Sequence, residues 1–238
     1  LVSFIGAGSA GDIEVFIVND GSTDNTACIA AKYVKKYPGI FKLVNKENGG
    51  HGSAVNSGIS EAKGKYFKTV DGDDWVDTAA LRELISFIKV TDADVISTDY
   101  RWVDDKTHKK IKEIKNEFEG LKYRKKYIFD SVCSEIYINM HAMAIKTEIL
   151  QKNKIKLDTH CFYVDAEFVL LPVPYINTIA FLPKPVYMYR LGLPTQSVAL
   201  LNMQKNCKDH EKVLRRVVHL YDGNKSILSK PKKEYLEK

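Results

Sequence analysis

Residues 12–24 have the sequence DIEVFIVNDGSTD, and this stretch decides the fold class. Its first half is a short, nearly continuous apolar run, which is typical of a buried strand in a parallel sheet. The run ends at Asn19-Asp20-Gly21-Ser22, and residues 22–24 offer side chains that can cap a helix. Apolar residues then recur at helical spacing until Tyr37-Pro38-Gly39. The stretch therefore predicts a strand, a turn and a helix in succession.

Strand-like and helix-like segments continue to alternate after this unit. Apolar runs at 40–44, 65–70 and 94–98 alternate with helical patterns at 53–61 and 77–88. Such alternation predicts an α/β fold in which helices cover both faces of a mostly parallel sheet.

The N-terminal residues do not fit this alternation. Residues 1–5 also resemble a buried strand, yet only residues 6–11 separate them from the next strand. A crossover between parallel strands needs about a dozen residues or more. We therefore expect that a loop and a helix are missing between Ile5 and Asp12.

The second half of the chain has a weaker pattern. Its residues 106–126 are highly charged and are interpreted as an insertion. Further segments are predicted as an amphipathic stretch at 131–138, strands at 142–145, 179–182 and 186–190, and helices at 162–171 and 202–221.

The composition is that of an ordinary soluble globular protein. Of the 238 residues, 45% are apolar and 28% are charged, and the net charge is +6. Short basic runs are interpreted as solvated faces, with a patch for phosphate-rich partners or for an anionic membrane surface as the alternative, and no motif indicates a nucleic-acid partner. No apolar run is long enough to cross a bilayer. The four cysteines have no paired spacing, which argues against zinc and disulfides and favours a reducing cytoplasm.

Three carboxylates follow the predicted strand at 65–70. Asp71, Asp73 and Asp74 lie within four consecutive positions, and like charges gathered in this way need a compensating partner. A magnesium or manganese ion would supply one, because hard cations prefer oxygen ligands and often carry substrate phosphates. The stretch indicates a nucleotide-handling enzyme, while an acidic turn that caps the helix near residue 77 is the open alternative.

Two segments before the acidic stretch carry candidate binding residues. Asp20 lies at the C-terminal end of a predicted parallel strand, where open α/β sheets bind ligands. Asn48, Gly49 and Gly50 belong to a glycine-rich turn that could bring the backbone close to a ligand. The neighbouring His51 is interpreted as an exposed turn residue rather than a catalytic base. Ordinary turns are the alternative for both segments.

Two later segments carry polar residues that could face a ligand. Asp165 and Glu167 form a second carboxylate cluster, in which Asp165 is a candidate general base and a solvated first helical turn is the alternative. Arg190 precedes a loop that could close over a ligand and bring the guanidinium to a phosphate. This loop contains Gly192, Pro194, Gln196 and Ser197.

In this order, the segments resemble the family 2 glycosyltransferases with the GT-A fold. The matching blocks are IEVFIVNDGSTDNT, NKENGGHGSAVNSGISEAKGKYFKTVDGDDWVD, FYVDAEF and YMYRLGLPTQSVA. The first two blocks cover most of residues 12–78, and the later two match more loosely. The resemblance implies a Rossmann-like, three-layer α/β/α sandwich with a mostly parallel central sheet. It also implies an inverting transfer of a sugar from a nucleotide sugar, with UDP-sugar preferred, to a hydroxyl acceptor in bacterial cell-surface polysaccharide synthesis.

The resemblance also implies roles for single residues. Asp20 would contact the nucleotide base, and Asp71 and Asp73 would hold the ribose and a divalent metal (Mn²⁺ or Mg²⁺) that bridges the two phosphates. Asp74 would support them, and Asp165 would be the catalytic base. The remaining expected nucleotide-sugar contacts are Asn48, Gly49, Gly50 and Arg190.

The chain departs from the family pattern in three places. It lacks the loop that follows the first strand at Ile5, a loop that helps to form the nucleotide pocket in this family. Val55 stands where many members carry an arginine near the diphosphate, and Val164 precedes Asp165 where a glutamate is common.

The family also suggests an organisation of the chain and its partners. We expect one domain over 1–221, with a nucleotide-binding half at about 1–100, an acceptor-binding half at about 101–200, a helix at 201–221 and a tail at 222–238. The expected acceptor is a glycan or lipid-linked glycan. The expected location is the cytoplasm, with peripheral association at the inner face of the membrane as an alternative. A nucleotidyltransferase and a non-catalytic nucleotide- or glycan-binding domain are the alternative functions.

Overall fold

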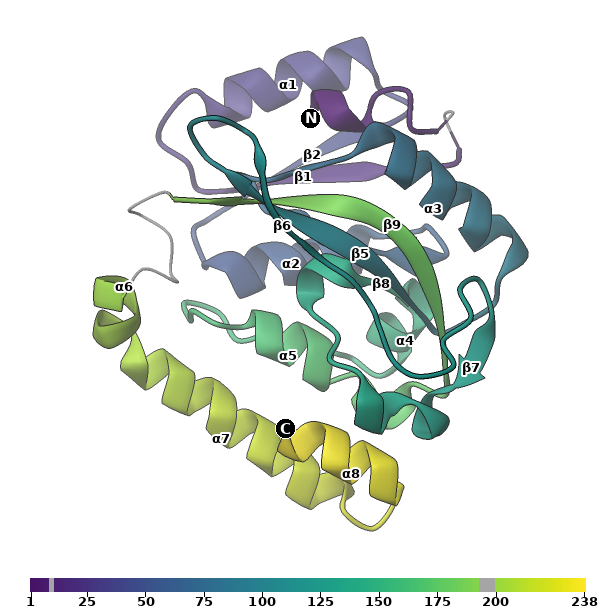
Figure 1. The fold of residues 1–238 in the computed structure, drawn as a ribbon. Coiled ribbons are helices and arrows are strands. Elements are labelled where there is room, and N and C mark those ends of the chain that lie inside the picture. The colour runs from purple at the N-terminus through teal and green to yellow at the C-terminus, as the bar shows by residue number, and fades with distance from the viewer. Residues whose placement is uncertain (9–10, 193–199) are drawn as a thin grey trace.

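The computed structural model describes residues 1–8, 11–192 and 200–238. Its centre is a seven-stranded sheet with helices on both faces (Figure 1). The main path of the sheet runs through β3 (Tyr66–Phe67), β8 (Met143–Lys146), β5 (Val95–Asp104), β9 (Thr178–Leu191) and β4 (Trp75–Val76). Two further strands lie off this path: β6 (Lys110–Ile114) pairs with β5, and β7 (Lys126–Ile128) pairs with β9.

The predicted strand–turn–helix unit at the start of the chain is confirmed. β1 (Val15–Asp20) pairs in parallel with β2 (Phe41–Lys46) in a separate two-stranded sheet. The connecting helix α1 (Thr26–Lys36) covers this small sheet (Figure 1). Tyr33 of α1 packs edge-on against the buried Phe41 at 5.8 Å between ring centroids.

The central sheet is mixed, so the expectation of a mostly parallel sheet is wrong. β5 and β9 are parallel, but β3 with β8, β8 with β5, and β4 with β9 are antiparallel. The charged segment predicted as an insertion contains β6, which returns from β5 through a short turn. Such a turn is too short for a crossover and forces the antiparallel direction. The three-layer α/β/α arrangement is confirmed.

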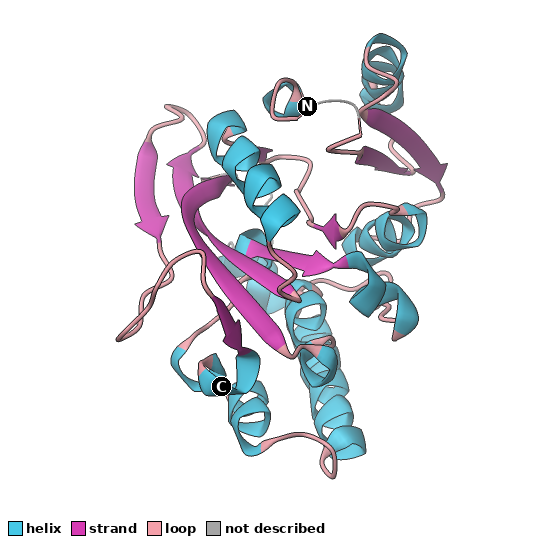
Figure 2. Ribbon diagram, turned by 90° about the vertical axis from the view of Figure 1, so that its right-hand side faces the viewer, coloured by secondary structure: helices cyan, strands magenta, loops and turns pink. Residues whose placement is uncertain are grey.

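The two helical layers bury opposite faces of β5. On one face, Leu81 and Leu84 of α3 (Thr78–Val90) pack in one cluster with Ile96. On the other face, Val95 packs with apolar side chains of α2 (His51–Glu61), α4 (Thr147–Lys152) and α5 (Asp165–Leu170). Burial of each large apolar side chain contributes about 1.5–3 kcal/mol. Figure 2 shows the helices on both sides of the strands.

Two expected elements differ in the structure. Residues 1–5 are not a buried strand, because Val2–Phe4 form a short 3-10 turn that contains no buried residue. The two strands predicted at 179–190 are one strand, β9, whose pairing with β5 is irregular between Leu182 and Pro185 because prolines cannot donate to the ladder. The stretch predicted as amphipathic at 131–138 contains part of two 3-10 turns, Phe129–Ser131 and Cys133–Glu135.

The C-terminal region forms three helices. The expected helix is split into α6 (Leu200–Lys205) and α7 (Cys207–Asn224). The segment 222–238, expected to be a tail, contains α8 (Lys230–Glu237), and Tyr235 of this helix is buried and accepts a hydrogen bond from the Ile138 amide at 3.2 Å. Among the described residues, no helix combines the length and apolar character that a membrane span requires.

Candidate active site

The acidic turn after β3 meets a histidine from a distant part of the chain. One ligand-type atom from each of Asp71, Asp74 and His141 lies within 4.8 Å of the others. His141 belongs to a 3-10 turn, Met140–Ala142, directly before β8. Because β8 runs antiparallel to β3, the segment that leaves β3 and the segment that enters β8 lie at the same place. We call these three residues the metal-type group.

The strand β9 holds the carboxylates of this group in place. The buried Tyr187 donates its hydroxyl proton to Asp74 Oδ2 at 2.5 Å and accepts from the Asp71 amide at 3.2 Å. The Arg190 amide donates to Asp74 Oδ1 at 2.8 Å. Asp73 lies on the exposed outer side of the turn, outside the metal-type group, and its expected metal contact stays a prediction.

The metal-type group is short of positive charge. Burial raises the pKa of Asp74 to about 7, although the hydrogen bonds from Tyr187 and Arg190 oppose the shift. Burial also raises the pKa of Asp71, and the nearby His51 opposes it. A divalent cation would favour the ionised carboxylates, so proton release would accompany metal binding. The carboxylate and imidazole donors together fit such an ion.

His141 is a neutral imidazole with a fixed orientation. Asn139 Oδ1 accepts a hydrogen bond from the His141 amide at 3.1 Å, which identifies this atom as the oxygen, and it also contacts Nδ1 of the ring. Nδ1 therefore carries the proton, and Nε2 presents a lone pair 4.0 Å from Asp71 Oδ2. Burial, with smaller contributions from the positive charges of Lys68 and His51, lowers the pKa of His141 to about 3.

A partly buried lysine, Lys68, fixes the backbone beneath this ring. Lys68 Nζ donates to the carbonyl oxygens of His141 at 2.5 Å and Met143 at 3.3 Å. It also lies 5.4 Å from the centroid of the Tyr187 ring. Burial lowers the pKa of Lys68 to about 7, while Asp71 opposes the shift. Lys68 thus joins the end of β3 to the turn that carries His141.

The glycine-rich turn and Asp20 come together as expected. Asp20 accepts hydrogen bonds from the amides of Gly49 at 3.0 Å and Gly50 at 2.8 Å, and it pairs with Lys46 at 2.5 Å. Asn48 Nδ2 donates to the Asp20 carbonyl at 3.0 Å. Burial alone would raise the pKa of Asp20, but Lys46 and the two amides outweigh it and lower the pKa. The role of these residues toward a nucleotide stays a prediction.

The glycines of this turn also allow the segment 157–161 to pack closely against it. A Cβ at Gly52 would lie 2.1 Å from the Asp158 carbonyl oxygen, so only glycine fits there. The His160 amide donates to the Gly49 carbonyl at 2.6 Å, and Asn56 exchanges two hydrogen bonds of 2.8 Å with the Leu157 backbone. The segment 157–161 leads directly into α5, so the turn positions the predicted base.

Asp165 faces the metal-type group across His51. Asp165 is the first residue of α5 and its side chain is 54% exposed. His51, the first residue of α2, has Nε2 at 3.7 Å from Asp165 Oδ1 and Nδ1 at 3.7 Å from Asp71 Oδ1. The interpretation of His51 as an exposed turn residue is therefore wrong. The N-terminus of α2 lies at the site, and helix N-termini bind anions such as phosphate.

Glu167 has a different environment from Asp165. Its side chain is fully buried, and Oε2 accepts from the Asp158 amide at 2.7 Å and from Arg216 Nη1 of α7 at 3.0 Å. Arg216 also pairs with the Asp158 carboxylate. Burial raises the pKa of Glu167, and these hydrogen bonds and the positive charge of Arg216 oppose the shift. Of the two acids in the predicted cluster, only Asp165 is accessible to an acceptor.

Arg190 lies at the edge of the site. Its amide binds Asp74, and its guanidinium lies 3.4 Å from Asp105 Oδ1 in the turn between β5 and β6. The phosphate contact expected of Arg190 stays a prediction. Pro194, Gln196 and Ser197 of the proposed closing loop lie outside the described residues.

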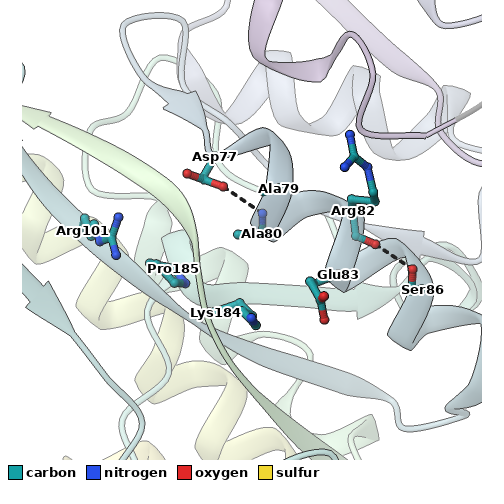
Figure 3. A pocket seen from close by; sticks show the side chains of 9 residues that line it. All are labelled: Asp77, Ala79, Ala80, Arg82, Glu83, Ser86, Arg101, Lys184 and Pro185. Carbon is teal, nitrogen blue, oxygen red and sulfur yellow. Dashed lines mark hydrogen bonds between the residues drawn. The ribbon is translucent and has the colours of Figure 1, made fainter.

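Two cavities lie near these elements. One of about 380 Å³ between α3 and β9 is lined by Arg82, Glu83, Arg101 and Lys184 and contains no member of the metal-type group (Figure 3). The other, of about 240 Å³, includes Asn139 and Ala142 on either side of His141, together with Tyr100 and Tyr137. Only the second cavity adjoins the turn that carries His141.

Three residues of the site escaped the sequence analysis. His51 adjoins the glycine-rich turn that was expected to face a ligand, so its position offered a signal. His141 and Tyr187 belong to no local motif, and they join the acidic turn only because β8 and β9 pair in the central sheet.

Comparison with known sequences identifies relatives. A family model described as glycosyl transferase family 2 matches residues 3–153. The uncharacterized glycosyltransferase EpsJ of Bacillus subtilis is 37% identical over 89 residues, which cover 37% of this chain and 26% of that protein. The cholesterol galactosyltransferase of Borreliella burgdorferi is 25% identical over 213 residues, which cover 82% of this chain and 57% of that protein. The chain thus spans about a quarter to little more than half of these relatives.

Solved structures share the fold at low sequence identity. Staphylococcus aureus TarS 1–349 in complex with UDP-GlcNAc superposes with a TM-score of 0.66 at 19% identity, covering 92% of this chain and 62% of that chain. The mannosyltransferase PcManGT of Pyrobaculum calidifontis, in complex with GDP-Man and Mn²⁺, gives 0.56 at 18% identity and covers 99% and 63%. These likenesses confirm the expected GT-A fold. Together with the family model, which matches more than half of the sequence, they establish that the chain belongs to glycosyl transferase family 2.

Proposed function

We propose that this chain carries the active site of an inverting glycosyltransferase that uses a nucleotide sugar, with UDP-sugar preferred, in cell-surface polysaccharide synthesis. One observation carries this function: an exposed carboxylate and a metal-type group face each other across the first residue of a helix. His51 lies 3.7 Å from Asp165 on one side and from Asp71 on the other. Such an arrangement can bind a diphosphate leaving group and activate a nucleophile at the same place.

The donor would occupy the space between α2 and the acidic turn. Asp71 and Asp73 would hold the ribose and the metal, Asp74 would orient them, and Asp20 with the turn at Asn48, Gly49 and Gly50 would receive the nucleoside. The complexes of TarS with UDP-GlcNAc and of PcManGT with GDP-Man and Mn²⁺ support a nucleotide-sugar donor and a divalent metal. Arg190, close to Asp74, would approach the phosphates.

In this proposal, one group of residues stabilises the leaving diphosphate and Asp165 activates the acceptor hydroxyl on the opposite side. When bound, the metal supplies Lewis-acid neutralisation of the departing diphosphate. Amide groups at the N-terminus of α2 would add positive potential to the same oxygens. Asp165 would take the proton from the acceptor hydroxyl while that oxygen displaces the diphosphate from the anomeric carbon. A single displacement from the opposite face inverts the configuration at that carbon.

The proposal also covers the acceptor and the cellular location of the enzyme. A glycan or lipid-linked glycan would approach Asp165 from the second half of the chain, where Tyr100 and Tyr137 line the cavity beside His141. A lipid-linked acceptor would bring a cytoplasmic enzyme to the inner face of the membrane. The proposed division assigns the donor to about residues 1–100 and the acceptor to about 101–200.

Substitution of the base tests the proposed activity. UDP-, GDP- and dTDP-sugars are screened for binding and hydrolysis with Mn²⁺, and Asp165→Asn is then compared with wild type. We expect the variant to retain donor affinity and to lose about 10²–10⁴-fold in transfer or hydrolysis, which is the usual contribution of a general base. Glu148→Gln removes an exposed acid of α4 that pairs only with Lys152 in the described structure, and should leave both properties unchanged.

Two results would contradict this function. If no nucleotide sugar binds or is hydrolysed, the chain is a non-catalytic module or handles another ligand. If nucleoside triphosphates are turned over instead and sugars are not, a nucleotidyltransferase replaces the glycosyltransferase.

A further inference from the structure

We propose that Nε2 of His141 is a direct ligand of the divalent metal beside Asp71, and that this nitrogen makes the site select manganese over magnesium. The use of the metal in sugar transfer rests on the proposed function, but its binding by His141 can be measured without any donor. Nothing in the local sequence around Asn139-Met140-His141 indicates a metal ligand. The assignment comes from what surrounds the ring in space.

The imidazole is aimed into the metal-type group. The His141 side chain is 8% exposed, and its Nε2 lies 4.0 Å from Asp71 Oδ2. Within the described residues, one ligand-type atom each of Asp71, Asp74 and His141 falls inside 4.8 Å, which leaves room for an ion between them. No described protein group forms a hydrogen bond with Nε2 in this structure, whereas Nδ1 is engaged by Asn139.

The surrounding side chains prepare the ring for a ligand role. His141 stacks on Tyr189 at 4.4 Å and on Tyr100 at 5.6 Å between ring centroids, and the edge of Tyr187 closes a third side at 4.7 Å. Asn139 accepts the Nδ1 proton, so the lone pair on Nε2 faces the carboxylates. Metal-bound histidines usually donate their second N–H in this way, which fixes both tautomer and ring orientation.

The donor set predicts which ion binds. Magnesium prefers six oxygen ligands and keeps several waters, whereas imidazole suits transition-type divalent ions. One nitrogen from His141 with carboxylate oxygen from Asp71 therefore favours Mn²⁺ over Mg²⁺. If Asn139 is replaced by Leu, the ring loses its orienting acceptor, and Mn²⁺ affinity should fall by about 10–100-fold, as is usual for such supporting residues.

His51 is the rival nitrogen. Its Nδ1 lies 3.7 Å from Asp71 Oδ1, closer to that carboxylate than His141 is, and its Nε2 is buried without a hydrogen-bond partner among the described residues. That Nε2, however, lies 3.7 Å from Asp165 rather than within the metal-type group, and the His51 side chain is 37% exposed. If His51 were the nitrogen ligand, its substitution would remove that ligand and substitution of His141 would not. The two substitutions therefore distinguish the two histidines.

Pulsed electron paramagnetic resonance of Mn²⁺ bound to the full chain, without nucleotide, tests the assignment. Electron spin-echo modulation should show coupling to one directly bound ¹⁴N, and labelling with ¹⁵N-histidine should shift the modulation to the ¹⁵N frequency. This labelling identifies a histidine ligand without any mutation. The coupling should disappear in His141→Asn and persist in His51→Asn, with circular dichroism confirming that each variant folds.

Titration of both metals completes the test. We expect Mn²⁺ to bind at least tenfold more tightly than Mg²⁺ in wild type, and this preference should shrink toward unity in His141→Asn. Absence of nitrogen coupling in wild type would overturn the assignment, as would loss of coupling in His51→Asn with retention in His141→Asn. Nitrogen-coupled Mn²⁺ in a protein that turns over no nucleotide sugar would uphold the assignment and contradict the proposed function instead.

Discussion

Two acidic clusters of this protein are both partly or wholly buried, yet they differ in how their charge is balanced. Glu167 and Asp158 share Arg216 of α7, which lies within 3.0 Å of Glu167. Among the described residues, the near partners of Asp71 and Asp74 are hydroxyl, amide and neutral imidazole groups, together with the half-exposed His51 and the partly buried Lys68. The first cluster therefore has its counter-charge within the chain, whereas the second has donor atoms placed so that a cation could bind them.

The cluster of Glu167, Asp158 and Arg216 also explains the position of Asp165, the proposed base. Glu167 is two residues from Asp165, and its pairing with Arg216 fixes α5 against α7. On the other side, the glycine-rich turn receives the segment before α5 through His160 and Leu157. Asp165 is therefore an exposed acid on a rigid support, as a general base requires.

The largest expected effect is the loss of the internal partner. Arg216→Met would leave the buried Glu167 without a compensating charge, and we expect the free energy of unfolding to fall by about 3–5 kcal/mol. Urea denaturation measures this loss. The matched substitution Arg215→Met removes an exposed pair with Glu211 on the same helix and should cost less than about 1 kcal/mol. Equal losses of free energy of unfolding in Arg216→Met and Arg215→Met would show that Arg216 does not balance the buried charge of Glu167.

The next largest effect is the stabilisation of the folded protein by Mn²⁺ bound at the metal-type group. Mn²⁺ at one hundred times its dissociation constant should raise the free energy of unfolding of the wild type by about 2.7 kcal/mol, because it binds only the folded state. Asp71→Asn should abolish this gain, and Arg215→Met should retain it. Thermal denaturation with and without Mn²⁺ measures both. Equal stabilisation of wild type and Asp71→Asn would place the ion elsewhere.

A smaller effect is expected at the contact between β9 and the acidic turn. Tyr187→Phe removes the hydroxyl that donates to Asp74 and accepts from the Asp71 amide. Leaving these groups unsatisfied should cost about 1–3 kcal/mol of stability without metal, and Mn²⁺ affinity should fall as Asp74 loses its orientation. Tyr123→Phe serves as the control, because the Tyr123 hydroxyl makes one exposed hydrogen bond to the Asn116 carbonyl. A stable Tyr187→Phe variant with unchanged Mn²⁺ affinity would remove Tyr187 from the site.

The smallest effect on stability is expected at Asp73. This side chain is exposed, so Asp73→Ala should change the free energy of unfolding by no more than about 0.5 kcal/mol. Its predicted contact with the donor would show only when nucleotide is present, as a roughly tenfold or about 1.4 kcal/mol weaker binding of UDP with Mn²⁺. Calorimetric titration separates the two quantities, and unchanged UDP affinity would exclude Asp73 from the donor site.

The first half of the fold could be predicted because its signals are local. The strand before Asp20, the capped helix after Asp77 and the acidic turn itself each follow from a few consecutive residues. The mixed direction of the sheet could not be predicted in this way. It depends on β8, which comes later in the sequence than both β3 and β5 but lies between them in the sheet. It also depends on β6 turning back along β5.

The candidate site shows the same limit. Asp71, Asp74 and Asp165 stand out as acids at element ends, and the structure brings them close to one place. His141, Tyr187 and Arg216 carry no such mark, because each acts only through a neighbour supplied by tertiary packing. The distinction between Asp165 and Glu167 likewise needed the burial of each side chain, since two acids in one helical turn are equivalent in sequence.

The most direct test of the central claim is the affinity for UDP measured by calorimetry with and without Mn²⁺, in wild type and in Asp71→Asn. If the acidic turn binds a cation that holds the diphosphate, UDP should bind wild type at least tenfold more tightly with Mn²⁺ than without it. The same addition should change nothing in Asp71→Asn. Equal UDP affinity with and without Mn²⁺ in the wild type would contradict the account.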